Sequence, residues 1–250
     1  MRFKDQVVFI TGGASGIGKA AAFAFAQEGA HIAIADIQEE LGRQVTAELN
    51  EQGKKATFTV CNVADYTSVQ AAIQHCHSHF GRLDIGLNNA GIGAPMATTR
   101  ELELPDWDRV VAVNQSGVFY CMKEELAIME QQGSGCIVNV SSIAGLRGLP
   151  RQMVYTATKH AVVGMTKTTA LEYARYGIRV NAVCPVFTKT PLVDQLFATA
   201  EGMDQILLRT IPMRRFGEVE DIVNAILWLC DPASSFVTGL ALPVDGGQNV

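Results

Sequence analysis

Short apolar segments alternate along the chain with longer stretches in which apolar residues recur at helical spacing. Near-continuous apolar segments are typical of strands buried on both faces, and the stretches between them are long enough for crossover helices. Because such crossovers are right-handed, the pattern predicts a doubly wound α/β fold, with helices on both faces of a seven-stranded parallel sheet. The expected strands are Gln6–Ile10, His31–Ala35, Ala56–Val60, Asp84–Asn88, Cys136–Val140, Ile178–Cys184 and Leu240–Val244.

No feature of the chain marks a domain boundary: there is no linker rich in Ser, Gly or Pro, no repeat and no low-complexity segment. We therefore expect one domain that covers residues 1–250. The least periodic stretch is 187–217, which Pro191, Gly202 and Pro212 interrupt. Since ligands of open α/β sheets bind beyond the carboxyl ends of the strands, we interpret this insertion as a substrate lid.

Composition and charge exclude several classes of partner. The net charge is −5 and there is no basic run, so the chain lacks the cationic surface that binds nucleic acid. No apolar stretch approaches the roughly 18 residues of a membrane span, and the first ten residues lack the layout of a signal peptide. The six cysteines are scattered without a CxxC pair, which favours reduced, buried thiols. We expect a cytoplasmic protein.

Three histidines, His75, His77 and His79, form the one cluster that suggests a metal. On a helical wheel they flank an apolar stripe, and His77 points away from the other two. Because no third ligand is near, we expect solvated histidines and no metal site.

The segment from Val7 to Gly18 is a strand, a glycine-rich turn and the start of an alanine-rich helix, as in Rossmann-type nucleotide sites. Gly12 permits the tight turn, Gly16 lets backbone amides approach a pyrophosphate, and Gly18 allows the helix to pack closely on the strand. The spacing Gly-x3-Gly-x-Gly differs from the general fingerprint Gly-x-Gly-x-x-Gly, so the turn alone does not decide the function.

Asp36 follows the second strand, eighteen residues after Gly18, where a carboxylate can accept hydrogen bonds from adenosine ribose hydroxyls. The alternative is a solvated loop residue or a helix cap. The same charge would repel the 2′-phosphate of NADP, and no Arg or Lys stands at 13–15 or at Ile37 to neutralise one. The sequence therefore favours NAD over NADP.

Tyr155 and Lys159 lie four residues apart at the start of a predicted helix, on one face. A phenol with a pKa near 10 must lose roughly 3 units, about 4 kcal/mol, to exchange protons near neutrality. An ammonium about 4 Å away contributes that order of energy at an effective dielectric of about 20. The strand before this helix ends in Ser141 and Ser142, either of which could bind a substrate oxygen. Asn114, inside a helical pattern, suggests a polar role facing the site.

These motifs, in this order, resemble the short-chain dehydrogenase/reductase family over nearly the whole chain. They are Thr11-Gly12-x3-Gly16-Ile17-Gly18, Asn88-Asn89-Ala90-Gly91, Asn114, Ser142 thirteen residues before Tyr155, Tyr155-x3-Lys159 and Asp245-Gly246-Gly247. The resemblance implies an alcohol dehydrogenase or carbonyl reductase that assembles as a homotetramer through helices near 106–131 and 153–176.

The resemblance also implies the role of each site residue. Tyr155 would be the general acid/base, Ser142 would polarise the substrate carbonyl, Lys159 would bind the nicotinamide ribose and lower the pKa of Tyr155, and Asn114 would hold a proton-relaying water. Thr190 and the backbone of Thr188 would contact the carboxamide. The full set of expected NAD contacts is Gly12, Ser15, Gly16, Ile17, Gly18, Asp36, Asn62, Val63, Asn89, Ala90, Gly91, Tyr155, Lys159, Pro185, Thr188 and Thr190.

Two positions depart from the family pattern. Asn62 stands where Asp is usual, and its amide can still bond adenine, so we expect a change in affinity only. Val186 stands where Gly is usual; valine cannot adopt glycine-only backbone angles and adds bulk, so we expect a narrower pocket beside the nicotinamide.

The expected pocket wall is mainly apolar, with Arg147 as a candidate anion contact, which favours a hydrophobic secondary alcohol or ketone as substrate. Two other functions remain open: a 3-oxoacyl carrier-protein reductase, against which Asp36 argues because that activity usually uses NADPH, and an NAD-binding sensor without chemistry, against which the intact catalytic residues argue. The wall residues are Ala144, Met153, Val186, Phe187, Leu192, Val193 and Leu196.

Overall fold

The computed structural model describes residues 1–191, 193 and 202–250. Its core is a seven-stranded sheet in which all neighbouring strands pair in parallel, in the order β3-β2-β1-β4-β5-β6-β7. The predicted doubly wound sheet is therefore confirmed, and every strand end lies within one residue of its expected position. The strands are β1 (Val7–Thr11), β2 (His31–Asp36), β3 (Ala56–Val60), β4 (Ile85–Asn88), β5 (Gly135–Val140), β6 (Ile178–Pro185) and β7 (Ala241–Val244).

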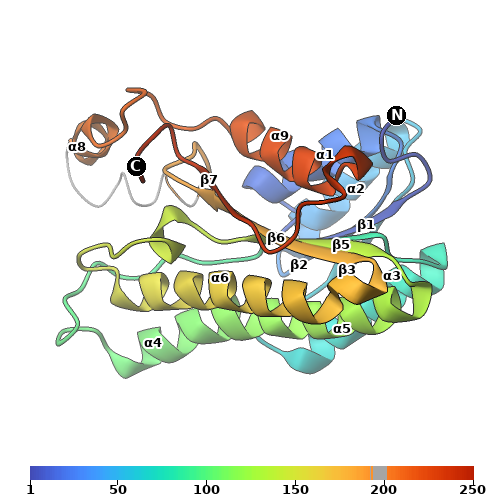
Figure 1. The fold of residues 1–250 in the computed structure, drawn as a ribbon, viewed down its shortest axis with the longest axis horizontal. Helices are drawn as coiled ribbons and strands as arrows, with labels where there is room; N and C mark the ends of the chain where they lie inside the picture. The colour runs from blue at the N-terminus through green and yellow to red at the C-terminus, as the bar shows by residue number, and fades with distance from the viewer. Residues whose placement is uncertain (192, 194–201) are drawn as a thin grey trace.

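Helices cover both faces of the sheet (Figure 1). On one face, α1 (Gly16–Gln27) packs against α9 (Val219–Cys230), with α2 (Glu39–Glu51) beside them. The other face carries α3 (Tyr66–Phe80), α5 (Gly117–Gln132) and α6 (Met153–Tyr173). The remaining described elements are α4 (Leu104–Val111), the π-helical turn η1 (Ala112–Ser116), α8 (Met203–Arg209) and the 3-10 turns η2 (Ile143–Gly145), η3 (Ala174–Tyr176) and η4 (Pro232–Ser234).

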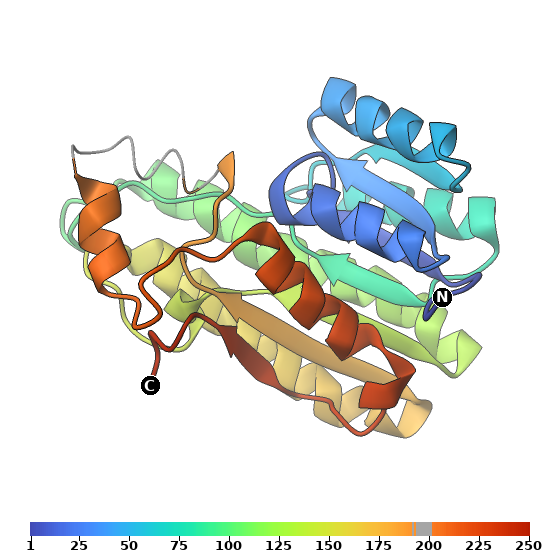
Figure 2. The ribbon, with the colours of Figure 1, turned by 90° about the horizontal axis from the view of Figure 1, so that it is seen from above.

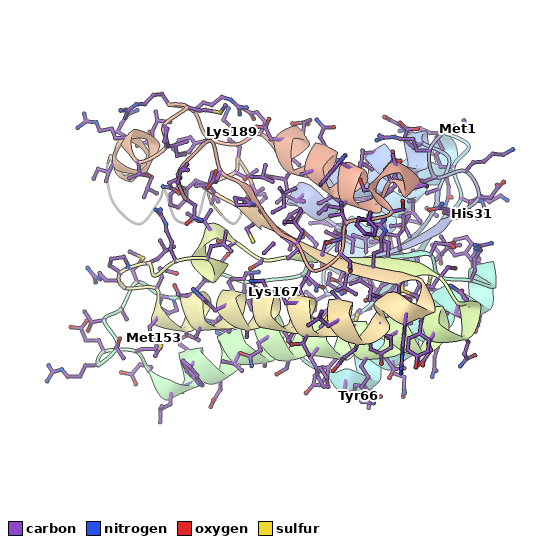
Figure 3. All side chains as sticks on the ribbon, viewed as in Figure 1. Met1, His31, Tyr66, Met153, Lys167 and Lys189 are labelled. Carbon is purple, nitrogen blue, oxygen red and sulfur yellow. The ribbon has the colours of Figure 1, made fainter. Side chains whose placement is uncertain are left out.

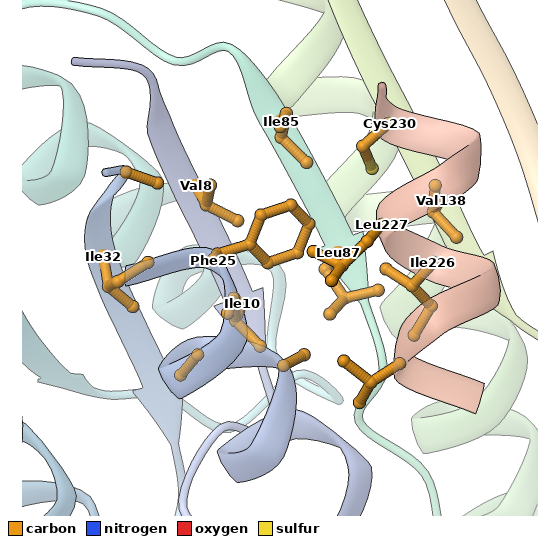
Figure 4. Packing of buried hydrophobic residues seen from close by; sticks show 14 of the residues in the cluster. Val8, Ile10, Phe25, Ile32, Ile85, Leu87, Val138, Ile226, Leu227 and Cys230 are labelled. Atoms are coloured by element: carbon orange, nitrogen blue, oxygen red, sulfur yellow. The ribbon is translucent and has the colours of Figure 1, made fainter. Parts of the chain in front are cut away.

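Each face of the sheet has its own apolar core. On the α1/α9 face, Phe25 of α1 lies among Val8, Ile85 and Leu227 (Figure 4). Small residues on α1, such as the buried Ala21, let this helix approach the strands closely. A second core fills the space between the sheet and α3, α5 and α6. The strands are thus buried on both faces, which is why their sequences are almost continuously apolar.

The carboxyl ends of the strands lie together at one edge of the sheet. Seen from above, α8 and the start of α6 lie at this end, and the amino terminus lies at the opposite end (Figure 2). The side-chain view places Met153 and Lys189 at the former and Met1 and His31 at the latter (Figure 3). In the sheet register Thr11 faces Asn88. Polar residues that end different strands are therefore neighbours in space.

The insertion after β6 begins and ends at one place. Lys189 N donates to Gly217 O at 3.0 Å, and Gly217 N donates to Phe187 O at 3.0 Å. These bonds join the two ends of the insertion, at the positions where the sequence predicts that it starts and stops. Residues 192 and 194–201 of the expected lid lie outside the described residues, Leu192 and Leu196 among them.

The histidine cluster on α3 has the arrangement that the helical wheel predicts. Val69, Ala72, Ile73 and Cys76 are buried, and the imidazoles of His75 and His79 stack with their centroids 6.0 Å apart. His75 Nε2 lies 3.1 Å from Thr57 Oγ1. Within the described part of the chain no three His, Cys, Asp or Glu side chains are grouped to hold a metal ion, and no helix is long and apolar enough to cross a membrane.

Candidate active site

The glycine-rich turn leaves no room for side chains. Gly12 has a φ of +65°, a conformation that suits glycine, and a Cβ on Gly18 would lie 2.1 Å from Gly12 O. Ser15 is the extended N-cap of α1, and its side chain makes no capping hydrogen bond. The strand therefore meets the first turn of α1 in close backbone contact, where the helix dipole favours an anion.

Asp36, at the end of β2, is tied to this turn. One carboxylate oxygen accepts from Ala14 N and the other from Gln38 N, both at 2.9 Å, and the residue is only 6% exposed. Two backbone donors satisfy a carboxylate that water barely reaches. Of the two alternatives for Asp36, the solvated loop residue is therefore wrong. Each oxygen keeps further acceptor capacity for a ligand hydroxyl.

Asn89, just after β4, holds the turn from the other side. Its amide nitrogen donates to Thr11 O at 3.1 Å and to Gly12 O at 3.0 Å. Thr11 Oγ1 accepts from the backbone N of Asn89 at 3.1 Å and of Ala90 at 3.2 Å. Sequence reasoning missed the part that the Thr11 hydroxyl plays, although the register of β1 and β4 follows from the fold.

Tyr155, Ser142 and Lys159 converge at the ends of β5 and α6. The Lys159 ammonium lies 5.6 Å from the centroid of the Tyr155 ring and donates to Val140 O at 2.9 Å. Lys159 is 4% exposed, and burial lowers its pKa to about 8. The expected one-sided pairing of the two residues is therefore present.

The expected fall in the pKa of Tyr155 is not found. Burial raises the pKa of its phenol, and a hydrogen bond with the Ser142 side chain opposes this rise. Lys159 points its ammonium at a carbonyl oxygen and is itself desolvated, so the simple pairing of one charge with one phenol overstates its effect. Ser142 is the neighbour that favours the phenolate here.

The structure divides the two candidate serines. Ser141 Oγ donates to Lys159 O at 2.9 Å and is buried. Ser142 Oγ accepts from Ala144 N at 3.1 Å and interacts with Tyr155. Ser141 therefore fastens α6 to β5, while Ser142 is the hydroxyl beside the phenol. From the sequence alone, either serine could have been the one that binds a substrate oxygen.

Asn114 lies in the π-helical turn η1 between α4 and α5 and is fully buried. Its amide donates to Ile92 O at 2.9 Å, and its oxygen accepts from Ile92 N at 2.8 Å. A Cβ on Gly91 would lie 3.3 Å from the Asn114 oxygen and 3.7 Å from Lys159 Nζ, so these two groups face one small space. A π-helical turn is a frequent mark of functional sites.

Comparison with known proteins gives a consistent result. The family model described as enoyl-(acyl carrier protein) reductase matches residues 12–249. A cyclohexanol dehydrogenase of Acinetobacter sp. is 40% identical over 98% of this chain and 95% of its own. A 3-oxoacyl-[acyl-carrier-protein] reductase of Thermotoga maritima is 41% identical over 99% of both chains.

Solved structures agree with this chain almost throughout. A crystal structure of levodione reductase superposes with a TM-score of 0.95 at 38% identity and 99% coverage of both chains. An NAD+-bound xylitol dehydrogenase superposes with a TM-score of 0.93 at 32% identity, covering 99% of this chain and 100% of the other. The chain belongs to the short-chain dehydrogenase/reductase family. It is therefore an oxidoreductase of a family that uses pyridine nucleotides.

Other residues that we expect to contact the nucleotide lie at the same strand edge. A Cβ on Gly16 would touch the Thr190 methyl group at 3.6 Å, so Thr190 lies against the start of α1. Thr188 is buried and donates to Val186 O at 2.9 Å. Ile17 packs on the α1/α9 core, Val63 is buried against Gly117, and Pro185 ends β6 opposite Val244.

The two departures from the family pattern have different outcomes. Asn62 accepts from Ala64 N at 3.1 Å through its side-chain oxygen, a turn that Asp would also make. Val186 does not take a positive φ, so its backbone does not need a glycine conformation, and the expected narrowing of the pocket stays a prediction. Its side chain packs with Ile143 and Ile211, which places valine in an apolar cluster between the catalytic loop and the insertion.

Two described residues of the expected pocket wall lie in apolar surroundings near the catalytic loop. Phe187 packs on the cluster of Val186, and Met153 lines a hollow of about 390 Å³ beside residues 148–151. Arg147, the candidate anion contact, donates to Gln248 O at 3.0 Å, and its contact with an anion stays a prediction.

The residues present fit a dinucleotide of the type this family uses. Without side chains at Gly12 and Gly18 the start of α1 packs directly on the turn after β1, and the amides of a helix start suit a pyrophosphate. The Asp36 carboxylate at the end of β2 fits ribose hydroxyls.

Proposed function

We propose that this short-chain dehydrogenase interconverts a secondary alcohol and a ketone with NAD, and that Tyr155 is its general acid/base. The proposal rests on one observation above all: Ser142 and Lys159 flank the Tyr155 phenol at the same strand edge as the glycine turn. Carbonyl reduction requires a group that exchanges a proton, a hydroxyl donor and a buried cation, all beside a nucleotide site.

The residues around the nucleotide have distinct tasks. When bound, the nicotinamide ring supplies or accepts the hydride. The glycine turn and the α1 terminus would hold the pyrophosphate, Asp36 the adenosine ribose, and Asn89 to Gly91 the adjoining edge. Thr188 and Thr190 would contact the carboxamide, and Lys159 the nicotinamide ribose.

At the reacting oxygen, Ser142 donates a hydrogen bond and Tyr155 moves the proton. In alcohol oxidation the phenolate of Tyr155 takes the hydroxyl proton; in reduction the phenol returns it. The Ser142 hydrogen bond favours the phenolate, and the Lys159 ammonium, which lies 5.6 Å from the ring centroid and donates to Val140 O, adds less than the simple pairing predicts. Asn114 would place a water that carries the proton outward past Lys159.

The choice of NAD over NADP is carried by Asp36. Its buried carboxylate would face a 2′-phosphate with like charge, and no cation stands at 13–15 or 37. Two structural neighbours, the NAD+-bound xylitol dehydrogenase and a Brucella melitensis 3-ketoacyl-(acyl-carrier-protein) reductase complexed with NADH, carry the same cofactor type.

For the substrate we favour a largely apolar cyclic or aryl alcohol or ketone. The cluster of Ile143, Val186 and Ile211, with Phe187 on it, forms an apolar flank to the catalytic loop. The cyclohexanol dehydrogenase and levodione reductase relatives support this choice. The second candidate is 3-oxoacyl carrier-protein reduction, because a relative with that name is as similar as any of these.

The assembly we propose is a cytoplasmic homotetramer. Phe119 on α5 is 50% exposed and Leu171 on α6 is 86% exposed, and such large apolar side chains on neighbouring helices favour a subunit interface. The free, buried cysteines fit a reducing compartment. Sedimentation equilibrium tests the tetramer.

A substrate panel and one variant test the proposed function. Alcohols and ketones, a 3-oxoacyl thioester among them, are assayed with NAD(H) and NADP(H) side by side. We expect turnover of cyclic or aryl alcohols with NAD. Tyr155→Phe is expected to lower kcat by about 10²–10⁴-fold while NADH binding is kept. A wild-type chain that binds NADH and turns over no substrate would support the sensor instead.

A further inference from the structure

Glu125 is a carboxyl group that the proposed chemistry does not use. It lies on α5 and is 0% exposed, with its side chain turned toward β4. Burial raises its pKa to about 7, and a hydrogen bond from Asn88 only partly opposes this rise. Its Oε1 atom has no hydrogen-bond partner within the described residues. A buried charge without a cation is unstable, so the neutral acid is the form that fits this place.

The strand beneath Glu125 has a glycine where the carboxyl group lies. A Cβ on Gly86 would be 2.3 Å from Oε1 and 2.5 Å from the carboxyl carbon of Glu125. Glycine inside a strand usually weakens it, and it often marks a close approach. Gly86 therefore leaves the space that the Glu125 carboxyl group occupies, and we call the two residues a matched pair.

Glu125 ends a chain of buried hydrogen bonds. Asn88 Nδ2 donates to Glu125 Oε2 and to Asn139 Oδ1, both at 3.0 Å. Asn139 Nδ2 donates in turn to Thr166 Oγ1 at 2.9 Å. These four residues belong to α5, β4, β5 and α6 and are all buried. The chain thus joins both strands at the centre of the site to the helix that carries Tyr155.

On β4, the hydrogen-bonded side chain of Asn88 lies one residue before the segment that contacts the glycine-rich turn. Asn88 precedes Asn89, whose amide holds Thr11 O and Gly12 O. A shift of Asn88 would therefore displace the group that fixes the turn.

On β5, the hydrogen-bonded side chain of Asn139 lies one residue before the carbonyl group that binds Lys159. Asn139 precedes Val140, whose carbonyl accepts from Lys159 Nζ at 2.9 Å. The same strand continues to Ser142.

We propose that Glu125, as a neutral acid, is a positioning residue that holds the carboxyl ends of β4 and β5, and that its ionisation loosens nucleotide binding. This inference rests on the proposed function for its nucleotide, NAD. The ionised carboxylate would need donors beyond Asn88, which the apolar surroundings do not offer. Strand β4 would have to shift to admit water or another donor.

The groups that face Glu125 leave its charge uncompensated. From α3 comes the thiol of Cys76, whose pKa burial raises to about 12, and from α5 itself the thiol of Cys121, whose pKa burial also raises. Within the described part of the chain, β4, β5 and α6 contribute the neutral side chains of Asn88, Asn139 and Thr166. Among the described groups that face its carboxyl, Glu125 is thus the one that ionises near neutral pH.

The first test compares wild type with Glu125→Gln, which keeps an acceptor for Asn88 and stays neutral. The dissociation constant of NADH is measured by fluorescence titration from pH 6 to 8.5. We expect the wild-type constant to rise by about tenfold, the effect of a one-unit difference in the pKa of Glu125 between bound and free protein. Glu125→Gln should lose this rise and keep only the pH dependence that Lys159, with its pKa of about 8, gives to both proteins. Glu130→Gln, an exposed change of equal charge on the same helix, should follow wild type.

The second test needs no cofactor. Hydrogen–deuterium exchange of the 85–91 peptide is compared between wild type and Glu125→Gln at pH 6 and 8.5. We expect equal exchange at pH 6 and faster exchange in wild type at pH 8.5. Such a difference in a chain that binds no NADH would rule out the proposed cofactor and keep the positioning role of Glu125. Equal exchange at both values would overturn the inference, whatever the enzyme turns over.

A third pair of variants covers failure to fold. Gly86→Ala should lower the melting temperature, and Glu125→Ala added to it should restore part of the loss by removing the carboxyl group. Additive losses would show that the two positions do not meet and would overturn the matched pair.

Discussion

Asp36 and Glu125 are both buried carboxyl groups of one sheet, yet their surroundings are opposite. Asp36 ends β2, where backbone N–H groups of two loops reach both its oxygens. Glu125 lies over the middle of β4, where backbone amides are used by the ladder and one side-chain amide is its donor. Strand ends can therefore hold a charge, and strand centres favour a neutral acid.

This contrast separates ligand recognition from internal support. The charge of Asp36 is available to a nucleotide at the rim of the site. The neutral Glu125, by the inference above, keeps the carboxyl ends of β4 and β5 in position. The two regions can be tested by different measurements, the first by cofactor preference and the second by pH.

The largest expected effect concerns the turn that Asp36 fastens. Gly18→Ala places a Cβ 2.1 Å from Gly12 O, which neither backbone segment can avoid. We expect the free energy of unfolding to fall by about 3 kcal/mol or more, with loss of NADH binding. Gly148→Ala is the control, because its Cβ meets nothing within 4 Å and its φ is not positive, and it should change the free energy of unfolding by less than about 0.5 kcal/mol. Chemical denaturation checks both; equal effects would contradict the role of the turn.

The next effect isolates Glu125. Its folded-state pKa of about 7 exceeds the ordinary value of 4.5, so the folded chain binds the proton more tightly. Its contribution to stability is therefore present at acid pH and is lost as pH rises through 7. Relative to Glu125→Gln, wild type should lose about 3 kcal/mol of unfolding free energy between pH 5 and 8. If the free energies of unfolding of wild type and Glu125→Gln change with pH in the same way, Glu125 is not a neutral acid in the folded protein.

The smallest effect concerns cofactor choice. Asp36→Asn removes the charge that would oppose a 2′-phosphate and keeps an acceptor for the backbone. We expect the ratio of kcat/KM for NADP to that for NAD to rise by about tenfold, or about 1.4 kcal/mol. Glu39→Gln removes an equal, exposed charge nearby and should leave the ratio unchanged. If both variants change the ratio alike, general charge and not Asp36 sets the preference.

The sequence predicts the fold better than it predicts the environment of the site. Alternating apolar segments place every strand end within one residue, because burial on both faces is a strong constraint on composition. The spacing of Tyr155 and Lys159 predicts their shared face, because helical geometry is regular. Neither observation needs knowledge of distant contacts.

What sequence reasoning missed depends on contacts between elements. Burial reverses the expected pKa change of Tyr155, and Ser141 turns to α6 while Ser142 turns to the phenol. Val186 fits without a glycine conformation. Glu125 gave no signal, since a glutamate on a helix usually faces solvent; only Gly86 in an apolar strand hinted that something approaches there.

Deuterium transfer tests the central claim most directly. The best alcohol of the panel, carrying deuterium on its carbinol carbon, is incubated with NAD, and the reduced nucleotide is analysed by mass spectrometry. We expect one deuterium in the NADH formed by wild type and almost none with Tyr155→Phe, although this variant still binds the nucleotide. Label transfer by Tyr155→Phe at the wild-type rate would contradict the account.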